Sequence, residues 1–283
     1  MQKPLYTPKK DEPMRVAVFM SGSGTNAVKL IEQESVYLRA GETPPYHVAA
    51  VFTDNANDGN NAMKIARANG LVYVGQDLGE FARMNNRDIK DMKIRKHYFA
   101  QTVELLRKHG IDCVALAGYM VIVTSPLLEA FNDLIINVHP ADLSKRTPEG
   151  RPLFTGDKAV RKAILAGEQS LASTTHVVTA PVDGGAPLLI SRPVPVSLPA
   201  DVTLDELKLP ENASVLGAIA DSRQSLLKKF GDWTIFPKTL EWVAQGRFGR
   251  DCDGVMCLDG MPIPTGYRLP TTEASATAQP AKA

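Results

Sequence analysis

The feature that most constrains the fold is a series of short, nearly continuous apolar runs separated by stretches with helical periodicity. The runs are Arg15–Met20, His47–Phe52, Val72–Val74, Asp112–Ala117 and the stretch from Leu134 to Val138. Such a run is typical of a strand buried on both faces, because parallel strands are covered by helices on either side. The alternation predicts a mostly parallel sheet with helices on both faces, an α/β fold of the Rossmann-like type.

The later part of the chain predicts an antiparallel addition to this sheet. Residues Ser173–Val178 alternate between polar and apolar side chains, and Ala186–Arg192 resumes a strand after a glycine-containing turn. We expect two further helices, at 214–230 and 237–245. A hairpin with Asp259-Gly260 at its turn is expected near the end, since Asp-Gly suits a two-residue turn.

One folded domain is expected at residues 14–268. Residues 1–13 are polar and contain prolines, which predicts a flexible leader without the apolar core of a signal peptide. Residues 269–283 are mostly Ala, Thr and Pro in composition, which predicts a disordered tail.

Composition excludes several classes of partner. The chain has 283 residues, 44% of them hydrophobic and 22% charged, with a net charge of +1. That balance gives no reason to expect nucleic acid or a membrane surface as a partner, and no apolar run is long enough to span a bilayer. Three cysteines, an odd number without metal-type spacing, favour a reduced cytoplasmic setting and predict no metal site.

The first predicted strand ends in a glycine-rich turn, Ser21–Asn26, that leads into a helix. Glycines let the backbone approach an anion, and the free N–H groups of the first helical turn favour a phosphate. The turn lacks the full dinucleotide pattern, because Ala27 stands at the third glycine position. A tight turn that binds nothing remains the alternative.

Asn137 and His139 lie at the end of the strand that begins at Leu134. Residues two apart in a strand point to the same side, so an amide and an imidazole converge there. Asp183, in a glycine-flanked turn, is a candidate carboxylate that would raise the pKa of His139. Such a group could move a proton while the Asn137 amide donates to a developing oxyanion. A capped strand end and an ordinary Asp-Gly turn are the structural alternatives.

These motifs together resemble the folate-dependent formyltransferase family. The similarity runs from about Met14 to Arg268, and the glycine turn is most similar to that of the members that formylate glycinamide ribonucleotide. The motifs are Ser21-Gly-Ser-Gly-Thr-Asn26, Leu116-Ala-Gly-Tyr-Met120, Asn137-Val-His-Pro140, Thr175-His176, Val182-Asp-Gly-Gly185, Ile235-Phe-Pro237 with Trp242, Gly246-Arg247, and Leu258-Asp-Gly260 to Gly266-Tyr267.

The resemblance implies transfer of a formyl group from 10-formyltetrahydrofolate, as co-substrate, to the amine of glycinamide ribonucleotide in purine synthesis. The only partners it implies are these small molecules, bound by a monomer or homodimer. It implies catalysis by Asn137, His139 and Asp183. No serine or cysteine lies in an evident nucleophile motif, which favours direct transfer over a covalent enzyme intermediate. The other roles that the resemblance implies are phosphate binding by Gly24, Thr25 and Asn26, ribose binding by Asp232, and folate binding by Arg95, Met120, Val121, Ile122, Val123 and Asn137.

The chain departs from the family pattern in places that bear on the substrate. Ala141-Asp-Leu-Ser144 replaces the usual Ser-Leu-Leu-Pro, and the loop up to Gly156 is longer. Val121 stands where an arginine is common, and Asp232 where a glutamate contacts the ribose. Another amine acceptor, hydrolysis of the formylfolate, and a non-catalytic module that binds nucleotide or folate therefore remain alternatives. His176 matches a family histidine near the site, or is a strand histidine satisfied by its neighbours.

Overall fold

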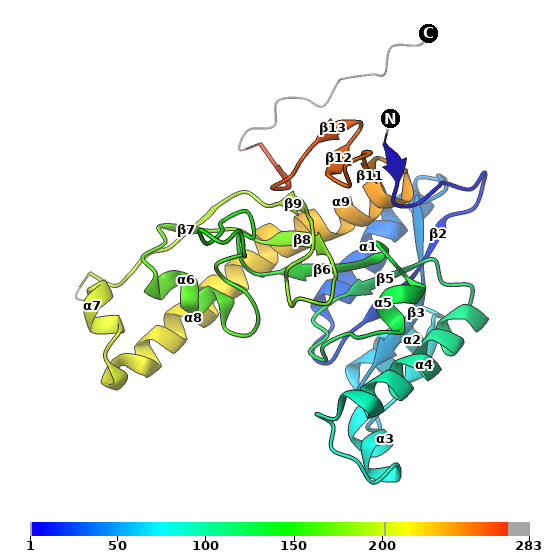
Figure 1. The fold of residues 1–283 in the computed structure, drawn as a ribbon, viewed down its shortest axis with the longest axis horizontal. Helices are drawn as coiled ribbons and strands as arrows, with labels where there is room; N and C mark the ends of the chain where they lie inside the picture. The colour runs from blue at the N-terminus through cyan, green and yellow to red at the C-terminus, as the bar shows by residue number, and fades with distance from the viewer. Residues whose placement is uncertain (1, 201, 271–283) are drawn as a thin grey trace.

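The computed structural model describes residues 2–200 and 202–270. At its centre is an eight-stranded sheet in the order β14-β9-β8-β6-β5-β2-β3-β4 (Figure 1). Its strands are β2 (Met14–Phe19), β3 (Tyr46–Thr53), β4 (Val72–Gly75), β5 (Cys113–Leu116), β6 (Ile135–His139), β8 (Thr174–Val177), β9 (Pro187–Ile190) and β14 (Tyr267–Arg268).

The strand pairing confirms the predicted fold class. Strands β2 to β6 pair in parallel, whereas β8 is antiparallel to β6 and β9 is antiparallel to β8. Strands β2 and β5 are neighbours in the interior of the sheet, and their residues are buried almost throughout. Strand β14 was not expected in this sheet; it pairs in parallel with β9 at the edge.

Helices cover both faces of the sheet, as predicted. Helices α1, α2 and α9 pack on one face, in a core that includes Leu30, Ala66 and Leu240. Helices α3, α4 and α5 pack on the other, around Phe99 and Leu106. The bounds are α1 (Thr25–Arg39), α2 (Asn61–Ala68), α3 (Leu78–Met84), α4 (Met92–Lys108), α5 (Leu127–Ala130) and α9 (Trp233–Ala244).

A third core forms an arm that extends from one end of the sheet, on the left of Figure 1. Residues Ala141 and Phe154, from the loop after β6, are buried in this core. The loop that departs from the family pattern is therefore packed against the arm. The elements of the arm are α6 (Ala159–Leu165), α7 (Leu204–Leu207), α8 (Ala213–Leu227), the 3₁₀ turn η1 (Pro210–Asn212), and the antiparallel pair β7 (Ser170–Leu171) and β10 (Val194–Pro195).

The two helices expected at 214–230 and 237–245 are present as α8 and α9, but they are joined in one continuous helical run, which was not expected. A π-helical segment, η2 (Lys228–Asp232), joins α8 to α9. Pro237 lies inside α9, where it removes one backbone donor without ending the helix. Widened π turns occur as local irregularities inside α-helices, frequently at functional sites.

The structure describes residues 2–13 of the predicted leader, but only residues 269 and 270 of the predicted tail. Residues of β1 (Lys3–Pro4) pair with β11 (Phe248–Arg250), and Tyr6 is buried, so this part of the expected flexible leader is held in place. A physical reason is that β11 would otherwise leave unpaired backbone groups at a sheet edge. Residues 271–283 of the expected tail lie outside the described residues.

The small sheet that holds this segment also contains the predicted hairpin. Strands β12 (Met256–Leu258) and β13 (Met261–Pro262) pair in antiparallel orientation. Asp259 and Gly260 between them both have positive φ, as a type I′ turn requires.

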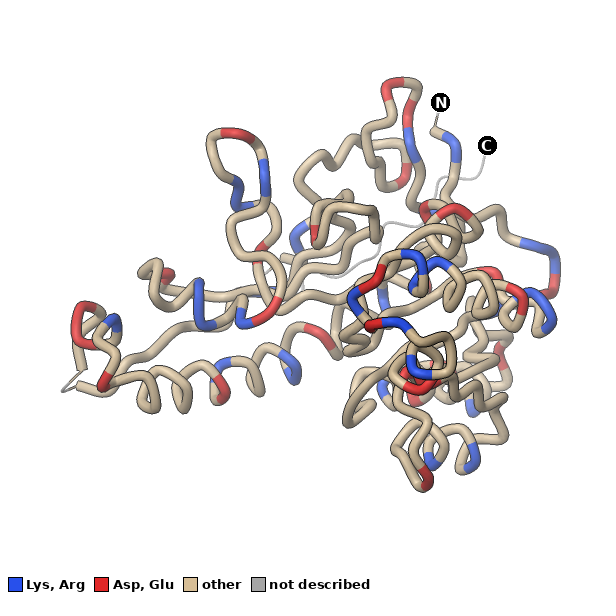
Figure 2. Tube along the Cα trace, turned by 60° about the horizontal axis from the view of Figure 1, so that its bottom comes forward, with Lys and Arg blue, Asp and Glu red and all other residues tan. Residues whose placement is uncertain are grey.

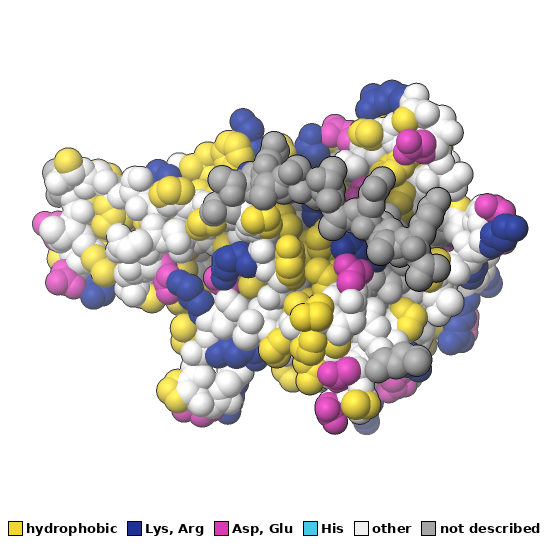
Figure 3. All heavy atoms as spheres, turned by 90° about the horizontal axis from the view of Figure 1, so that it is seen from above, with side chains coloured by type: hydrophobic (Ala, Val, Ile, Leu, Met, Phe, Trp, Pro, Cys, Tyr) yellow, Lys and Arg dark blue, Asp and Glu magenta, His cyan; other side chains and the backbone are white. Residues whose placement is uncertain are grey.

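Basic and acidic residues are interspersed along the chain trace (Figure 2). On the face seen in Figure 3, hydrophobic side chains gather near the middle of the molecule. No helix among residues 2–200 and 202–270 combines the length and apolar character needed to cross a membrane.

Replacing two glycines of the long helix by alanine should change the free energy of unfolding in opposite directions. A methyl group at Gly231 would lie 2.6 Å from Ser173 Oγ, whereas at Gly217 it would meet nothing within 4 Å. Gly217→Ala should therefore raise the free energy of unfolding by about 0.5–1 kcal/mol, because alanine favours helix. Gly231→Ala should lower it by about 1–3 kcal/mol through overpacking. Chemical denaturation measures both; equal effects would contradict the close contact at η2.

Candidate active site at the carboxyl ends of the parallel strands

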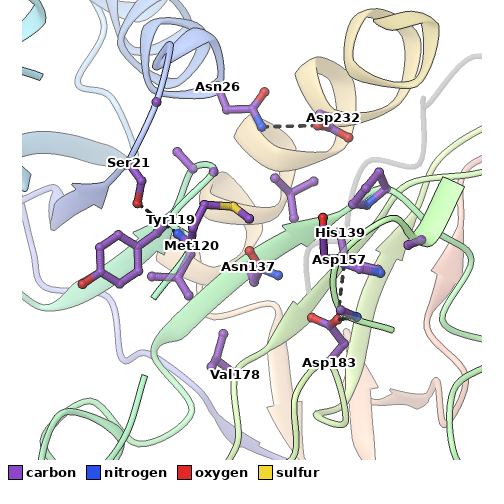
Figure 4. A pocket seen from close by; sticks show the side chains of 18 of the residues that line it. Ser21, Asn26, Tyr119, Met120, Asn137, His139, Asp157, Val178, Asp183 and Asp232 are labelled. Atoms are coloured by element: carbon purple, nitrogen blue, oxygen red, sulfur yellow. Dashed lines mark hydrogen bonds and ion pairs between the residues drawn. The ribbon is translucent and has the colours of Figure 1, made fainter. Parts of the chain in front are cut away.

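A cleft of about 810 Å³ opens where β2, β5 and β6 end (Figure 4). Ligands of open α/β sheets bind at this edge, because loops and helix N-termini meet there. The cleft brings together almost every residue that the sequence singled out: Gly24, Thr25, Asn26, Met120, Val121, Ile122, Val123, Asn137, His139, His176, Asp183 and Asp232.

The glycine turn at one end of the cleft has the geometry of an anion site. Gly24 precedes α1 with φ of 74°, and no side chain caps the helix. A methyl group at Gly24 would lie 2.5 Å from Ile65 Cδ1, so only glycine fits both the conformation and the space. The first N–H groups of a 15-residue helix, with its dipole, then face the cleft beside Thr25 and Asn26.

Strand register explains why two histidines and an amide meet at the other end. Strand β8 pairs with β6 so that His176 stands opposite Asn137. The Asn137 side-chain nitrogen lies 3.1 Å from His176 Nε2. His176 Nδ1 lies 2.9 Å from the Val177 carbonyl, and its Nε2 faces both the Asn137 amide and the Asp183 carboxylate. The second N–H of Asn137 stays available to a ligand.

The Asp183 carboxylate lies between the two histidines. Its two oxygens are each 3.4 Å from a ring nitrogen, Nδ1 of His139 and Nε2 of His176. It also accepts the Gly156 backbone N–H at 2.7 Å. Asp183 has φ of 53°, a left-handed conformation that aspartate tolerates better than most residues. The predicted pair of Asp183 and His139 is therefore brought together, with His176 as a third member.

The pKa values of His139 and Asp183 are both lowered, but for different reasons. Burial lowers the pKa of His139 below 6.5, and this outweighs the opposite effect of Asp183. Burial raises the pKa of Asp183, but the contacts with His176, His139 and the Gly156 N–H together lower it to about 2. Asp183 acts on the pKa of His139 in the expected upward direction, but the net direction for the buried ring is downward.

Both ring nitrogens of His139 face acceptors. Nε2 lies 2.8 Å from the Phe154 carbonyl, and Nδ1 faces Asp183. A neutral imidazole has one N–H and can donate to only one of them, whereas the imidazolium form donates to both. The two acceptors therefore favour the imidazolium form of His139, whereas burial of the ring opposes it.

The middle of the cleft is apolar at its rim. Met120, Ile122 and Val182 are 70%, 50% and 47% exposed, unusually high for large hydrophobic side chains.

Arg95 is not among the residues that line the cleft; its Nε donates to the Ile89 carbonyl at 2.8 Å. The structure therefore does not bring Arg95 to the other candidate folate residues.

Asp232 lies in the π segment and is 6% exposed. One of its oxygens is 3.3 Å from the Asn26 amide nitrogen, which links η2 to the glycine turn. The other oxygen, and the Asn26 carbonyl oxygen, have no hydrogen-bond partner. Burial raises the pKa of Asp232 above 3.8. Two buried acceptors at the wall of the cleft suit a ligand that donates hydrogen bonds.

Sequence reasoning missed several residues of the cleft. Asp221, Gln224 and Lys228 line it from the long helix, and Asp157 and Lys158 from the loop before α6. The first three are spaced three and four residues apart, so they share one helix face, and that face includes Asp232 one turn later. The spacing was a usable signal, but nothing in the sequence placed this helix beside the glycine turn.

No group of three or more His, Cys, Asp or Glu side chains is placed to hold a metal ion within the described ranges, 2–200 and 202–270.

The pKa of His139 gives a test that does not depend on turnover. Its NMR titration midpoint should lie below 6.5 in the wild type. Asp183→Asn should lower the midpoint further, because the neutral amide no longer favours the imidazolium. The His139 resonance is assigned from its absence in His139→Gln. A midpoint that rises in Asp183→Asn would contradict the arrangement described.

Comparison with known proteins identifies the family of this chain. A family model for formyl transferases matches residues 14–208. A phosphoribosylglycinamide formyltransferase of Haemophilus influenzae is 27% identical over 255 residues, which is 89% of this chain and 98% of the relative. A human trifunctional purine biosynthetic protein is 28% identical over 249 residues, 86% of this chain, which spans only 20% of that protein's length.

A solved structure, glycinamide ribonucleotide transformylase 1 from Symbiobacterium toebii, superposes with a TM-score of 0.63 at 27% identity. The match covers 88% of this chain and 95% of that one. Because the formyl transferase model matches more than half of the residues, the chain belongs to the formyl transferase family.

Proposed function

We propose that this enzyme transfers the formyl group of 10-formyltetrahydrofolate to the amine of glycinamide ribonucleotide, in purine biosynthesis. The observation that supports this most is the meeting of Asn137, His139 and Asp183 between a phosphate-type turn and an apolar rim. The names of the bacterial relative and of the solved structure refer to the same reaction.

The ribonucleotide fits the end of the cleft formed by α1 and η2. The free N–H groups at Gly24, Thr25 and Asn26 would bind its phosphate. Lys228 lines the same region and would add a positive charge. The unpartnered oxygen of Asp232 would accept a ribose hydroxyl.

The folate fits the apolar middle of the cleft. Exposed Met120 and Ile122 offer surface for a planar ring, and the backbone from Met120 to Val123 offers polar groups. Asn137 lies next to this segment and would also touch the co-substrate. Contact of Arg95 with folate rests on the family resemblance alone and would require its side chain to leave Ile89.

The chemistry is a direct transfer between two nitrogens. The amine nitrogen bonds to the formyl carbon, the bond from that carbon to the folate nitrogen breaks, and the amine proton ends on the folate nitrogen. The free N–H of Asn137 stabilises negative charge on the formyl oxygen. His139 moves the proton, and Asp183 stabilises the imidazolium while it exists.

This role requires one ring nitrogen of His139 to become free. Its Nε2 faces the Phe154 carbonyl, whereas Nδ1 faces the carboxylate that orients the ring. The substrate therefore has to replace Phe154 as the partner of Nε2. Phe154 belongs to the loop after β6 that departs from the family pattern, so the conformation of this loop bears directly on turnover.

We also propose that the enzyme works in the cytoplasm, as a monomer or homodimer, with small molecules as its only ligands.

Substitutions in the cluster should strongly reduce turnover and leave the fold intact. His139→Ala should reduce kcat by about 10²–10⁴-fold, the usual effect of losing a general acid-base group. Asn137→Ala should reduce it by about 10²–10³-fold. His97→Ala, an exposed histidine on α4, is the matched control and should keep wild-type kcat. Steady-state kinetics with glycinamide ribonucleotide measure kcat for each variant. Unchanged turnover in His139→Ala would contradict this mechanism.

Asp232 gives a test of the acceptor. The Asp232 side chain is buried and is one methylene shorter than the glutamate usual in the family. A different amine, or water, is therefore the alternative acceptor. If glycinamide ribonucleotide is the acceptor, Asp232→Asn should raise its KM about tenfold, because a hydrogen bond to a charged group is lost. The KM for formylfolate should stay within about twofold. An effect on the folate KM alone would place Asp232 outside the acceptor site.

A further inference from the structure

Ser21 joins the phosphate turn to the segment that lines the apolar part of the cleft. Its backbone N–H donates to the Gly118 carbonyl at 3.1 Å. Its hydroxyl accepts the Met120 backbone N–H at 3.0 Å, which is drawn in Figure 4. The start of segment 118–123 is thus attached to Ser21 by two hydrogen bonds.

The Ser21 hydroxyl has only one proton, and Asp54 takes it. The hydroxyl oxygen lies 2.5 Å from Asp54 Oδ1, so it donates to the carboxylate. A carboxylate can only accept, which fixes the hydroxyl with a lone pair left for Met120. A hydrogen bond to an ionised acceptor is also stronger than one between neutral groups. Asp54 therefore determines how Ser21 holds Met120.

Asp54 itself does not line the cleft. It follows β3 directly, and its carbonyl accepts the Leu78 N–H at the start of α3. The residues that line the cleft include Ser21 and Met120 but not Asp54. The hydrogen bond to Ser21 is therefore a direct link between Asp54 and the cleft.

The contact between Asp54 and Ser21 bears on the position of the segment that lines the cleft. Asp54, Ser21 and Met120 follow three neighbouring strands, β3, β2 and β5, at the same edge of the sheet. The exposed side chains of Met120 and Ile122 lie on the segment that this contact anchors. A shift of Met120 would move the polar backbone groups that a planar ligand needs at hydrogen-bond distance.

We propose that Asp54 is a positioning residue for the pterin-like co-substrate: through the Ser21 hydroxyl it fixes the Met120 backbone and the segment 120–123 that binds that ring. This role rests on the proposed function, because it assigns folate to this segment. It predicts an effect on folate binding and a small effect on the chemical step, which occurs at Asn137 and His139.

The experiment measures the Kd of 5-formyltetrahydrofolate by calorimetry, with steady-state KM and kcat for 10-formyltetrahydrofolate. Asp54→Ala should weaken binding and raise the folate KM about tenfold, with kcat within about twofold. Asp54→Asn keeps an acceptor for the hydroxyl and should stay within about threefold of the wild type. Ser21→Ala should match Asp54→Ala.

The double variant distinguishes positioning from general loosening. If Asp54 acts through Ser21, then Ser21→Ala combined with Asp54→Ala should bind folate no more weakly than Ser21→Ala alone. Asp77→Ala is the matched control: Asp77 caps α3 through the Glu80 N–H and does not contact Ser21. It should lower thermal stability and leave the folate Kd unchanged.

The outcomes separate this role from the proposed function. A wild type that neither binds 5-formyltetrahydrofolate nor turns over 10-formyltetrahydrofolate would overturn the proposed function, and this role with it. A wild type that binds while Asp54→Ala binds equally well would overturn the positioning role alone. Additive losses in the double variant, or equal losses in Asp77→Ala, would do the same.

Discussion

The Asp183 carboxylate is the interaction on which the candidate site depends. It faces one nitrogen of each buried histidine and accepts the Gly156 N–H from the loop after β6. Three chain segments, the end of β6, strand β8 and that loop, therefore meet at one charge. A buried carboxylate is stable only when such partners compensate its lost hydration. The depressed pKa of Asp183 shows that these partners more than compensate for its burial.

Strand pairing in the sheet positions the residues of this cluster. Parallel strands β2, β5 and β6 end at one edge, and the antiparallel return of β8 sets His176 across from Asn137. The glycine turn and the π segment close the same cleft from the opposite side, joined by Asn26 and Asp232. The candidate anion site and the candidate catalytic cluster thus share one cleft, which is the arrangement that the proposed transfer to a phosphorylated amine requires.

The sequence predicted those features that depend on local pattern. Buried strands, the turn at Gly24 and the convergence of Asn137 and His139 follow from periodicity and strand alternation. The partner Asp183 was named from its turn, but its contact with His176 depends on strand register. The continuous helix through Asp232 and the contact of Phe154 with His139 depend on tertiary packing, which local propensity does not encode. Arg95 was placed by resemblance in a loosely matched segment, and the structure leaves it outside the cleft.

The most direct test of the central claim is the fate of the formyl group. Purified enzyme is incubated with 10-formyltetrahydrofolate, with and without glycinamide ribonucleotide, and the products are identified by mass spectrometry. The account predicts formylated glycinamide ribonucleotide in a one-to-one ratio with released tetrahydrofolate, and no folate release without the amine. Release of formate in the absence of the amine, or no consumption of formylfolate under either condition, would contradict it.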